Sequence, residues 1–200
     1  AVLNRHLGEP PAEFMYGGRR YTPRSFAASI VHLPWREYLM VTSFRYAPSN
    51  TYTELRVPDN WAHDTLYFNV PLDDFYEGIR GAVERGYSVA IDADVSELSY
   101  RTTKQYGIIP EADLASDSSD AAVRDRWFEV GSTTDDHWMD SVGYRRMGEH
   151  DWFLVKDSWR TAFEGPLGGY VFFHESYVRF KVLAYLVHRD AVPAILQRAT

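Results

Sequence analysis

Of the seven histidines in the sequence, His137 has the neighbours best suited to proton transfer. It follows two aspartates and begins an aromatic and branched segment typical of a strand, from which its ring could project into a cleft. Asp157 begins the turn after the next predicted strand, and pairing of the two strands would bring its carboxylate near the imidazole. A histidine that acts as a base needs one ring nitrogen tied to such an acceptor. Trp159 could keep water away from that bond and so strengthen it.

These residues also have a purely structural interpretation. His137 would then be a half-buried strand histidine, and Asp157 a residue that forms a turn. Both are common in proteins, so periodicity alone favours this structural interpretation.

Other clusters have weaker grounds. Asp92 and Asp94 lie two residues apart on one face of a predicted strand and could form a metal or acid pair, although aspartates at strand ends usually solvate a turn. The histidine–aspartate pairs at 63–64 and 150–151 are typical of surface loops. The sequence therefore predicts no metal site and no cofactor.

No other nucleophile or loop motif is convincing. Ser141 and Ser158 lie outside any G-x-S-x-G elbow. The aspartates of residues 113–125 lack the spacing of a calcium loop, and the glycines of 165–169 are not followed by the residues of a phosphate loop.

Composition narrows the class of protein. The 200 residues are 45% hydrophobic and 16% aromatic, enough to bury a core, so we expect one globular unit with an appended subdomain. The net charge is −7 with no basic stripe, so no nucleic-acid partner is expected. No apolar run approaches the about 20 residues of a membrane-spanning helix, so no membrane partner is expected. The absence of cysteine excludes disulfides and a thiol nucleophile from these residues.

The first third of the chain predicts short elements. Residues 2–7 suggest a helix that stops at Gly8, residues 13–21 suggest a hairpin, and Thr22 with Pro23 should begin a short helix. Residues 38–57 suit two extended segments joined by a turn at 48–50. Because the chain begins at a helix end without a methionine, we expect a processed chain.

The remaining chain predicts a helix followed by a sheet. Apolar residues recur at helical spacing from Leu72 to Val83, between strands at 65–70 and 87–93. We expect residues 112–125 to form a long loop with one helical turn. Five short aromatic or branched segments follow and favour an antiparallel sheet or a partly closed barrel: 127–130, 138–147, 152–156, 169–173 and 182–189.

Three of these segments in order, 136–144, 152–159 and 168–171, resemble the second half of papain-like cysteine peptidases. In that family a histidine base precedes a strand, Asn-Ser-Trp follows the next strand, and a Gly-Tyr strand comes after. Within it, residues 6–26, 68–89 and 175–193 resemble bleomycin hydrolases and bacterial aminopeptidase C, so the likeness covers nearly the whole chain.

The resemblance implies an α+β fold, a papain-like right-hand domain with an additional helix-strand subdomain. Residues 1–64 would be an inter-half segment with a hairpin and a short helix. Residues 65–200 would be the β-rich domain that carries the histidine and aspartate motifs.

The resemblance also implies a site. His137 would be the base of a thiolate–imidazolium pair and later the acid for the leaving amine, with Asp157 orienting its ring and Trp159 shielding the contact. Asp136 and Trp138 would support the site.

The family's cysteine and oxyanion glutamine lie in a half that this sequence lacks. The implied partner is therefore a cysteine-bearing N-terminal half, made as a separate or cleaved chain, and the substrate is a peptide. An aminopeptidase-like action, aided by residues 194–200 near the cleft, a homo-oligomer and a cytoplasmic location are also implied, with a processed or exported form as the alternative.

Two departures support an alternative function. Asp157 stands where the family has asparagine, and Trp138 stands where it has a small residue beside the substrate pocket. The alternative is a catalytically inactive relative used for binding or assembly. A third hypothesis is an unrelated hydrolase that uses His137 with Ser141 or Asp140.

Overall fold

The computed structural model describes residues 2–114 and 119–199, which form two compact units, 1–36 and 37–200. The first unit contains the predicted helix, hairpin and short helix. Its elements are α1 (Val2–Leu7), β1 (Phe14–Tyr16), β2 (Arg19–Tyr21), α2 (Pro23–Phe26) and the π-helix η1 (Ala27–Val31), followed by the 3-10 turn η2 (Trp35–Glu37) at the boundary.

The first unit has a small aromatic cluster in place of a buried core. The ring of Phe26 meets those of Phe14, Tyr16 and Tyr21 edge-on, with centroids 5.2, 5.1 and 5.6 Å away. Thr22 caps α2 through its hydroxyl, which accepts from the backbone N–H of Ser25. No described residue of this unit's helices is buried, so its elements are held mainly by local contacts.

The second unit is built on a ten-stranded sheet in the order β4-β5-β3-β12-β6-β9-β10-β11-β8-β7. All neighbours pair antiparallel except β3 with β5 and β8 with β11. The strands are β3 (Tyr38–Thr42), β4 (Thr51–Thr53), β5 (Tyr67–Asn69), β6 (Val89–Ala93), β7 (Tyr100–Arg101), β8 (Tyr106–Gly107), β9 (His137–Met147), β10 (His150–Lys156), β11 (Tyr170–His174) and β12 (Val182–His188). The described strands form an open sheet, since β4 and β7 end the order, and not a closed barrel.

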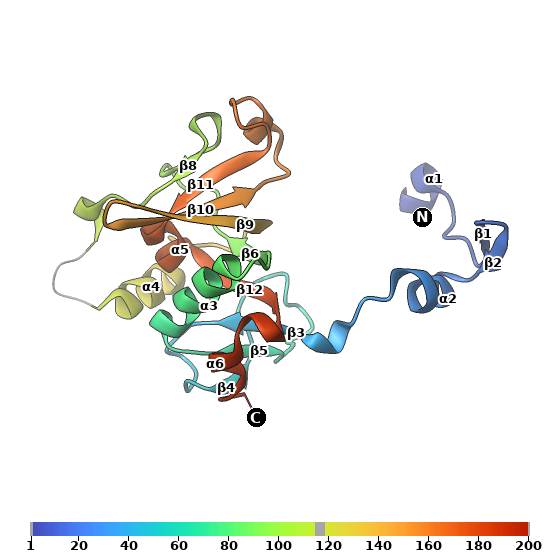
Figure 1. The fold of residues 1–200 in the computed structure, drawn as a ribbon, viewed down its shortest axis with the longest axis horizontal. Coiled ribbons are helices and arrows are strands. Elements are labelled where there is room, and N and C mark those ends of the chain that lie inside the picture. The colour runs from blue at the N-terminus through green and yellow to red at the C-terminus, as the bar shows by residue number, and fades with distance from the viewer. Residues whose placement is uncertain (1, 115–118, 200) are drawn as a thin grey trace. The chain divides into compact units, whose positions relative to one another are not determined.

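Helices pack on this sheet and complete the mixed α+β fold (Figure 1). The α-helices are α3 (Leu72–Glu84), α4 (Asp120–Glu129), α5 (Glu175–Lys181) and α6 (Pro193–Leu196), and the 3-10 turns are η3 (Thr102–Lys104), η4 (Glu111–Asp113), η5 (Arg160–Phe163) and η6 (Arg189–Ala191). α3 contacts β6 and β9, while α5 contacts β10, β11 and β12 as well as α3 and α4. No helix of the described residues is long and apolar enough to cross a membrane.

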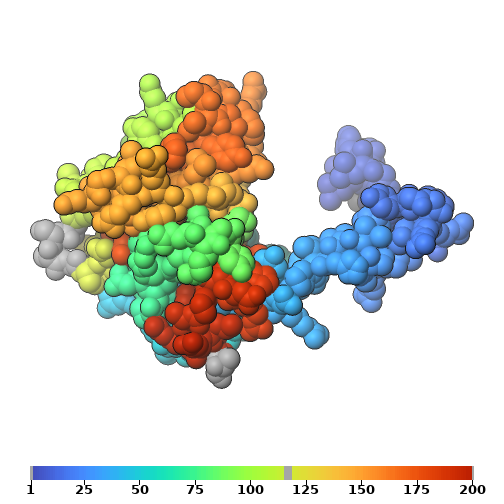
Figure 2. Space-filling view, viewed as in Figure 1, coloured from blue at the N-terminus to red at the C-terminus, as the bar shows by residue number. Residues whose placement is uncertain are grey.

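The helix predicted from apolar spacing is confirmed as α3. Its apolar face is buried, and Gly78 lets the hydroxyl end of Tyr185 approach, because a Cβ at Gly78 would lie 2.2 Å from that oxygen. Residues 191–198 lie against this helix. The guanidinium of Arg85 donates to the carbonyl of Ala191, and the C-terminal residues lie beside residues 80–90 on the face shown in Figure 2.

Two predictions between residues 112 and 130 are wrong. Helix α4, which Ser119 caps, takes the place of the strand predicted at 127–130 and of the second half of the expected loop. Residues 115–118 of that loop lie outside the described part. The aromatic residues that suggested a strand lie on the helix and pack inward, Trp127 on Phe180 and Phe128 on Phe44. Tertiary packing therefore overrides the local β-propensity.

The strands on either side of residue 64 share one sheet. β3 and β4 do not pair with each other, because β5 lies between them. The boundary expected after residue 64 thus falls inside the second compact unit and stays a prediction.

Candidate active site

The structure brings His137 and Asp157 together. His137 is the first residue of β9 and Asp157 directly follows β10, and these two strands pair antiparallel with Lys156 opposite Asp140. His137 Nε2 lies 3.0 Å from Asp157 Oδ1. The ends of the two strands thus place an imidazole and a carboxylate next to each other at the same point of the sheet.

The Asp157 carboxylate is buried, and both of its oxygens accept hydrogen bonds. Oδ1 accepts from the backbone N–H of Trp159 at 2.8 Å as well as from the ring, and Oδ2 accepts from the hydroxyl of Tyr100. The backbone N–H of Asp157 donates to Gly169 at 2.8 Å. A buried carboxylate with its acceptor sites filled is a stable, fixed anchor for the imidazole.

This contact fixes the roles of the two ring nitrogens. An ionised carboxylate only accepts hydrogen bonds, so Nε2 of His137 carries a proton towards Asp157. In the neutral ring, Nδ1 then presents a lone pair. None of the residues in the described ranges hydrogen-bonds to Nδ1. The geometry suits a base that exchanges its proton at Nδ1 while Nε2 stays anchored.

Trp159 partly covers the imidazole. Its ring centroid is 5.9 Å from that of His137, with the planes 74° apart. Trp159 is itself 57% exposed, and the side chain of His137 keeps 19% of its surface accessible to solvent.

A cavity of about 360 Å³ opens beside this group. Its wall combines the site residues with hydroxyl groups and one apolar side chain. The lining residues are Val95, Ser96, Tyr100, Thr102, Asp136, His137, Asp157, Trp159 and Thr161. A volume of this size could admit a few residues of an extended peptide or the side chains of a partner.

Asp136 shapes one wall of the cavity. Its carboxylate accepts from the backbone N–H groups of Val95 and Ser96 at 3.1 and 3.0 Å and from the Thr134 hydroxyl at 2.8 Å. Burial raises the pKa of Asp136, but these hydrogen bonds, led by Thr134, outweigh it and hold the pKa below its usual value. Asp136 therefore acts as an ionised clamp on the loop that lines the cavity.

Trp138 is not among the residues that line this cavity. It is the neighbour of His137 along β9, and successive side chains of a strand point to opposite faces. Trp138 pairs in register with Asp92 of β6 and is 38% exposed. In this structure it therefore does not narrow the space beside the histidine.

The hypothesis of a serine partner on β9 is wrong. Ser141 lies four residues along the strand from His137, about 13 Å away at 3.3 Å per residue. Its hydroxyl is buried and makes no hydrogen bond. Asp140 lies opposite Lys156 and about 10 Å along the strand from His137.

Several clusters from the sequence have structural partners. Asp92 and Asp94 are both 1% exposed. Asp94 accepts from the backbone N–H of Ser96 at 3.0 Å, the local turn contact expected of such an aspartate, and it also pairs with Lys181 at 3.3 Å. Burial, followed by the neighbouring carboxyl of Asp135, raises the pKa of Asp92 to about 9.

The loop position of His63 is as expected, and its ring pairs with a glutamate.

The interpretation of Asp151 as a loop residue is wrong. It lies in β10 and is buried, and its carboxylate accepts from the hydroxyls of Tyr76 and Tyr144, both at 2.7 Å. Burial raises the pKa of Asp151, but these two hydrogen bonds outweigh it and lower the pKa below its usual value.

Sequence reasoning missed Tyr100. Burial and the bond to Asp157 raise its pKa, so the phenol remains a donor to the carboxylate. Tyr100 lies 57 residues before Asp157 in a short edge strand, and no motif links the two. Only the packing of β7 against the site reveals the contact.

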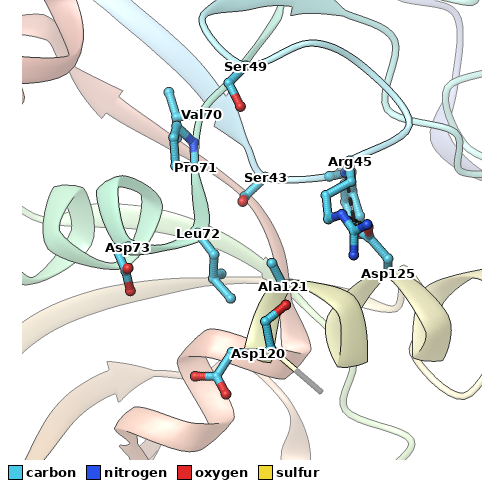
Figure 3. A pocket seen from close by; sticks show the side chains of 12 residues that line it. Ser43, Arg45, Ser49, Val70, Pro71, Leu72, Asp73, Asp120, Ala121 and Asp125 are labelled. Atoms are coloured by element: carbon cyan, nitrogen blue, oxygen red, sulfur yellow. Dashed lines mark hydrogen bonds and ion pairs between the residues drawn. The ribbon is translucent and has the colours of Figure 1, made fainter. Parts of the chain in front are cut away.

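A second cavity, of about 440 Å³, lies between the start of α3 and the start of α4 (Figure 3). Its charged groups include Arg45 and Asp125, which are paired at 3.6 Å, and the carboxylates of Asp73 and Asp120. None of the described residues that line it is a histidine, so it lacks the base that distinguishes the cavity beside His137.

Residues 194–200 were expected near the cleft. Of these, residues 194–199 belong to the described part of the chain, and none of those six lines the cavity beside His137. Ile195 of α6 is 4% exposed and would contact a Cβ placed at Gly78 of α3.

Neither a protein-family model nor a curated protein matches the sequence. Among solved structures, the chain is similar to PepW from Lactobacillus rhamnosis HN001, with a TM-score of 0.72 and 18% sequence identity. The match covers 99% of this chain and 48% of that one. The chain therefore has the fold of one part of PepW and spans about half the length of that protein.

Proposed function

We propose that this chain carries the general base of a papain-like cysteine peptidase of the bleomycin hydrolase type. The observation that carries the proposal is the bond from His137 Nε2 to Asp157 at the edge of a cavity, with Nδ1 left for proton transfer. The shared fold with PepW supports a peptidase relative, and the order of sequence motifs supports the thiol class.

The nucleophile has to come from outside these 200 residues, which contain no cysteine. The match to less than half of PepW is consistent with a missing portion. We propose that a cysteine-bearing segment or chain docks so that its thiol reaches His137 Nδ1. The oxyanion donors would come from the same partner.

The proposed reaction uses His137 twice. Nδ1 first takes the proton of the thiol, and the Asp157 carboxylate stabilises the resulting imidazolium. The thiolate forms a bond to the peptide carbonyl carbon, and the C–N bond breaks as Nδ1 protonates the leaving amine. Water, deprotonated by the same nitrogen, then hydrolyses the thioester and releases the acid and the thiol.

The second candidate is a binding or assembly protein with the same fold. The lack of a cysteine favours it, as does Asp157, an aspartate where the resembling family has asparagine. In that case His137 and Asp157 would only stabilise the strand ends. The two candidates differ in one property, the presence of a reactive thiol beside His137.

Covalent labelling distinguishes them. The native assembly is treated with an epoxide probe for thiol peptidases, and mass spectrometry identifies the labelled polypeptide. We expect a labelled cysteine outside these residues and a fall in labelling rate of about 100-fold or more in His137→Ala, because a positioned base contributes about 10²–10⁴-fold. His63→Ala is the matched control, since His63 is exposed and also paired with a carboxylate.

Labelling that is unchanged in His137→Ala would refute the role of His137. No labelling of an intact native assembly would favour the binding protein. A native preparation that contains only this polypeptide would refute the proposed partner.

A further inference from the structure

Two histidines and a glutamate converge at the end of β10 opposite to Asp157. One ring nitrogen each of His150 and His174 and a carboxylate oxygen of Glu175 all lie within 4.8 Å of one another. Among the described residues, these three are the histidine and acidic side chains whose ligand atoms lie close enough together to hold a metal ion.

These three side chains come from three different elements. His150 begins β10, while His174 ends β11 and Glu175 begins α5. The pairing of Trp152 with His174 sets the register, which leaves His150 just beyond the end of β11. The two imidazole centroids are 4.9 Å apart, and His150 Nδ1 lies 3.0 Å from Glu175 Oε1. Residues far apart in sequence are therefore fixed as neighbours by the strand pairing.

The two inner residues also have outer partners of the kind that orient metal ligands. His174 Nδ1 lies 2.9 Å from the hydroxyl oxygen of Ser176, which itself donates to the carbonyl of Ile109 and accepts from its N–H. The backbone N–H of Ser176 also donates to His174 Nδ1 at 3.2 Å, and while Nδ1 accepts this bond a neutral ring carries its proton on Nε2. Metal binding through Nε2 therefore requires the proton to move to Nδ1, where the Ser176 hydroxyl oxygen can accept it. Glu175 Oε2 accepts from the backbone N–H of Asp151 at 3.2 Å, which fixes the carboxylate. Such outer hydrogen bonds hold the direction of metal ligands, and here they orient the ring of His174 and the carboxylate of Glu175.

We propose that His150, His174 and Glu175 bind a late first-row divalent cation, with Zn²⁺ as the best fit. Two imidazoles and one carboxylate are a donor set that Zn²⁺ accepts, with water in the fourth position. Mg²⁺ and Ca²⁺ prefer oxygen ligands and suit this set poorly.

The approach that a metal requires is small. Tetrahedral ligands at about 2.1 Å from Zn²⁺ lie about 3.4 Å apart. The ligand atoms now lie within 4.8 Å of one another, so they must close by up to about 1.4 Å. The side chain of His150 is 51% exposed and can make this adjustment. Its present ion pair with Glu175 is partly exposed, and such pairs contribute little to stability. The metal would therefore displace a weak interaction.

This site is separate from the cavity beside His137. His150 and Asp157 lie at opposite ends of β10, seven residues apart, which corresponds to about 23 Å. A metal here would clamp the junction of β10, β11 and α5. Its binding does not depend on a thiol or on the proposed peptidase function.

The test is titration of the full chain, freed of metal by a chelator, with Zn²⁺ in a calorimeter and with Co²⁺ by visible absorption. We expect one equivalent to bind and the Co²⁺ spectrum to show tetrahedral coordination. His150→Gln and His174→Gln should each weaken Zn²⁺ binding about tenfold or more, since loss of even an outer partner costs about 10–100-fold. His63→Gln is the control, because His63 has a glutamate partner 2.7 Å away but does not belong to this three-residue group.

The proposal is overturned if the wild-type chain binds no Zn²⁺, or if His150→Gln keeps wild-type affinity. An equal loss in His63→Gln would also overturn it, because binding would then be a general property of surface histidines. His174 is 9% exposed and its replacement could disturb folding, so the exposed His150 variant decides the outcome.

Discussion

Lys181 is the clearest place to test the electrostatic basis of the fold. Its side chain is 2% exposed, and the ammonium contacts Asp94 Oδ2 at 3.3 Å, the Ser132 carbonyl at 2.6 Å and the Thr133 hydroxyl at 3.0 Å, as well as Glu97. Asp94 in turn accepts from the N–H of Ser96 and of Thr134, next to the loop clamped by Asp136. The lysine thus supports the wall of the cavity beside His137.

Lys181→Met keeps the length of the side chain but leaves Asp94 buried without its cation. Removal of one partner from a buried pair costs about 3–5 kcal/mol, so we expect a loss of that size in the free energy of unfolding at pH 7.5. The loss should depend on pH. Burial already raises the pKa of Asp94, and Lys181 opposes that rise.

Without the lysine, the pKa of Asp94 rises further in the folded state. A carboxyl with a raised folded-state pKa contributes stability that is complete below its unfolded pKa of about 3.9 and is lost as pH rises through the folded value. The deficit of Lys181→Met should therefore be smaller at pH 5 than at pH 7.5. Adding Asp94→Asn should recover part of the loss at pH 7.5, because no buried charge then remains at that position.

Urea unfolding at the two pH values measures these changes, with Lys156→Met as the exposed control, expected to change stability by less than about 0.5 kcal/mol. A loss below about 1 kcal/mol at pH 7.5 would refute the reasoning. So would a deficit that is equal at both pH values and is not relieved by Asp94→Asn.

Two further predictions concern the site and its surroundings. Tyr100→Phe removes a donor from the buried Asp157 carboxylate and should lower the free energy of unfolding by about 1.5–3 kcal/mol. Tyr106→Phe is the control and should cause little change, because its side chain is exposed. Equal urea midpoints for the two variants would contradict the prediction. Asp92→Asn should raise the free energy of unfolding at pH 8 by on the order of 2–4 kcal/mol and have little effect near pH 4. The reason is that burial raises the pKa of Asp92 to about 9, so its contribution to stability is lost as pH rises towards that value. Thermal unfolding at both pH values tests this, and destabilisation at pH 8 would contradict it.

Local patterns were sufficient for most elements of the fold. The 3.6-residue spacing of α3 and the aromatic strands around β9, β10, β11 and β12 could be predicted, because each pattern comes from one buried face. Helix α4 could not. Residues 112–125 are rich in Ser, Asp and Ala and so resemble a loop. The contacts that join α4 to the core come from Arg124, whose buried guanidinium donates to the carbonyls of Ser43, Arg179 and Leu183.

The sequence by itself determined which residues carry the candidate chemistry: a histidine that starts a strand, an aspartate that ends the next, and no thiol. The tertiary structure decided that they meet. Between Gly143 and Ser141 the register of β9 against β10 shifts by one residue, and this bulge moves the end of β10 one residue closer to His137. A shift of one residue also exchanges the two faces of a strand, so the contact between His137 and Asp157 depends on a pairing that no local pattern specifies.

The same physical reason applies to Tyr100 and to the cluster of His150, His174 and Glu175. Each contact joins residues at least 24 positions apart, except where β11 runs directly into α5. Residue types and periodicity determine what each segment can form, because those properties are local. Which side chains become neighbours depends on strand order, register and helix packing, because these are set by burial of the whole core.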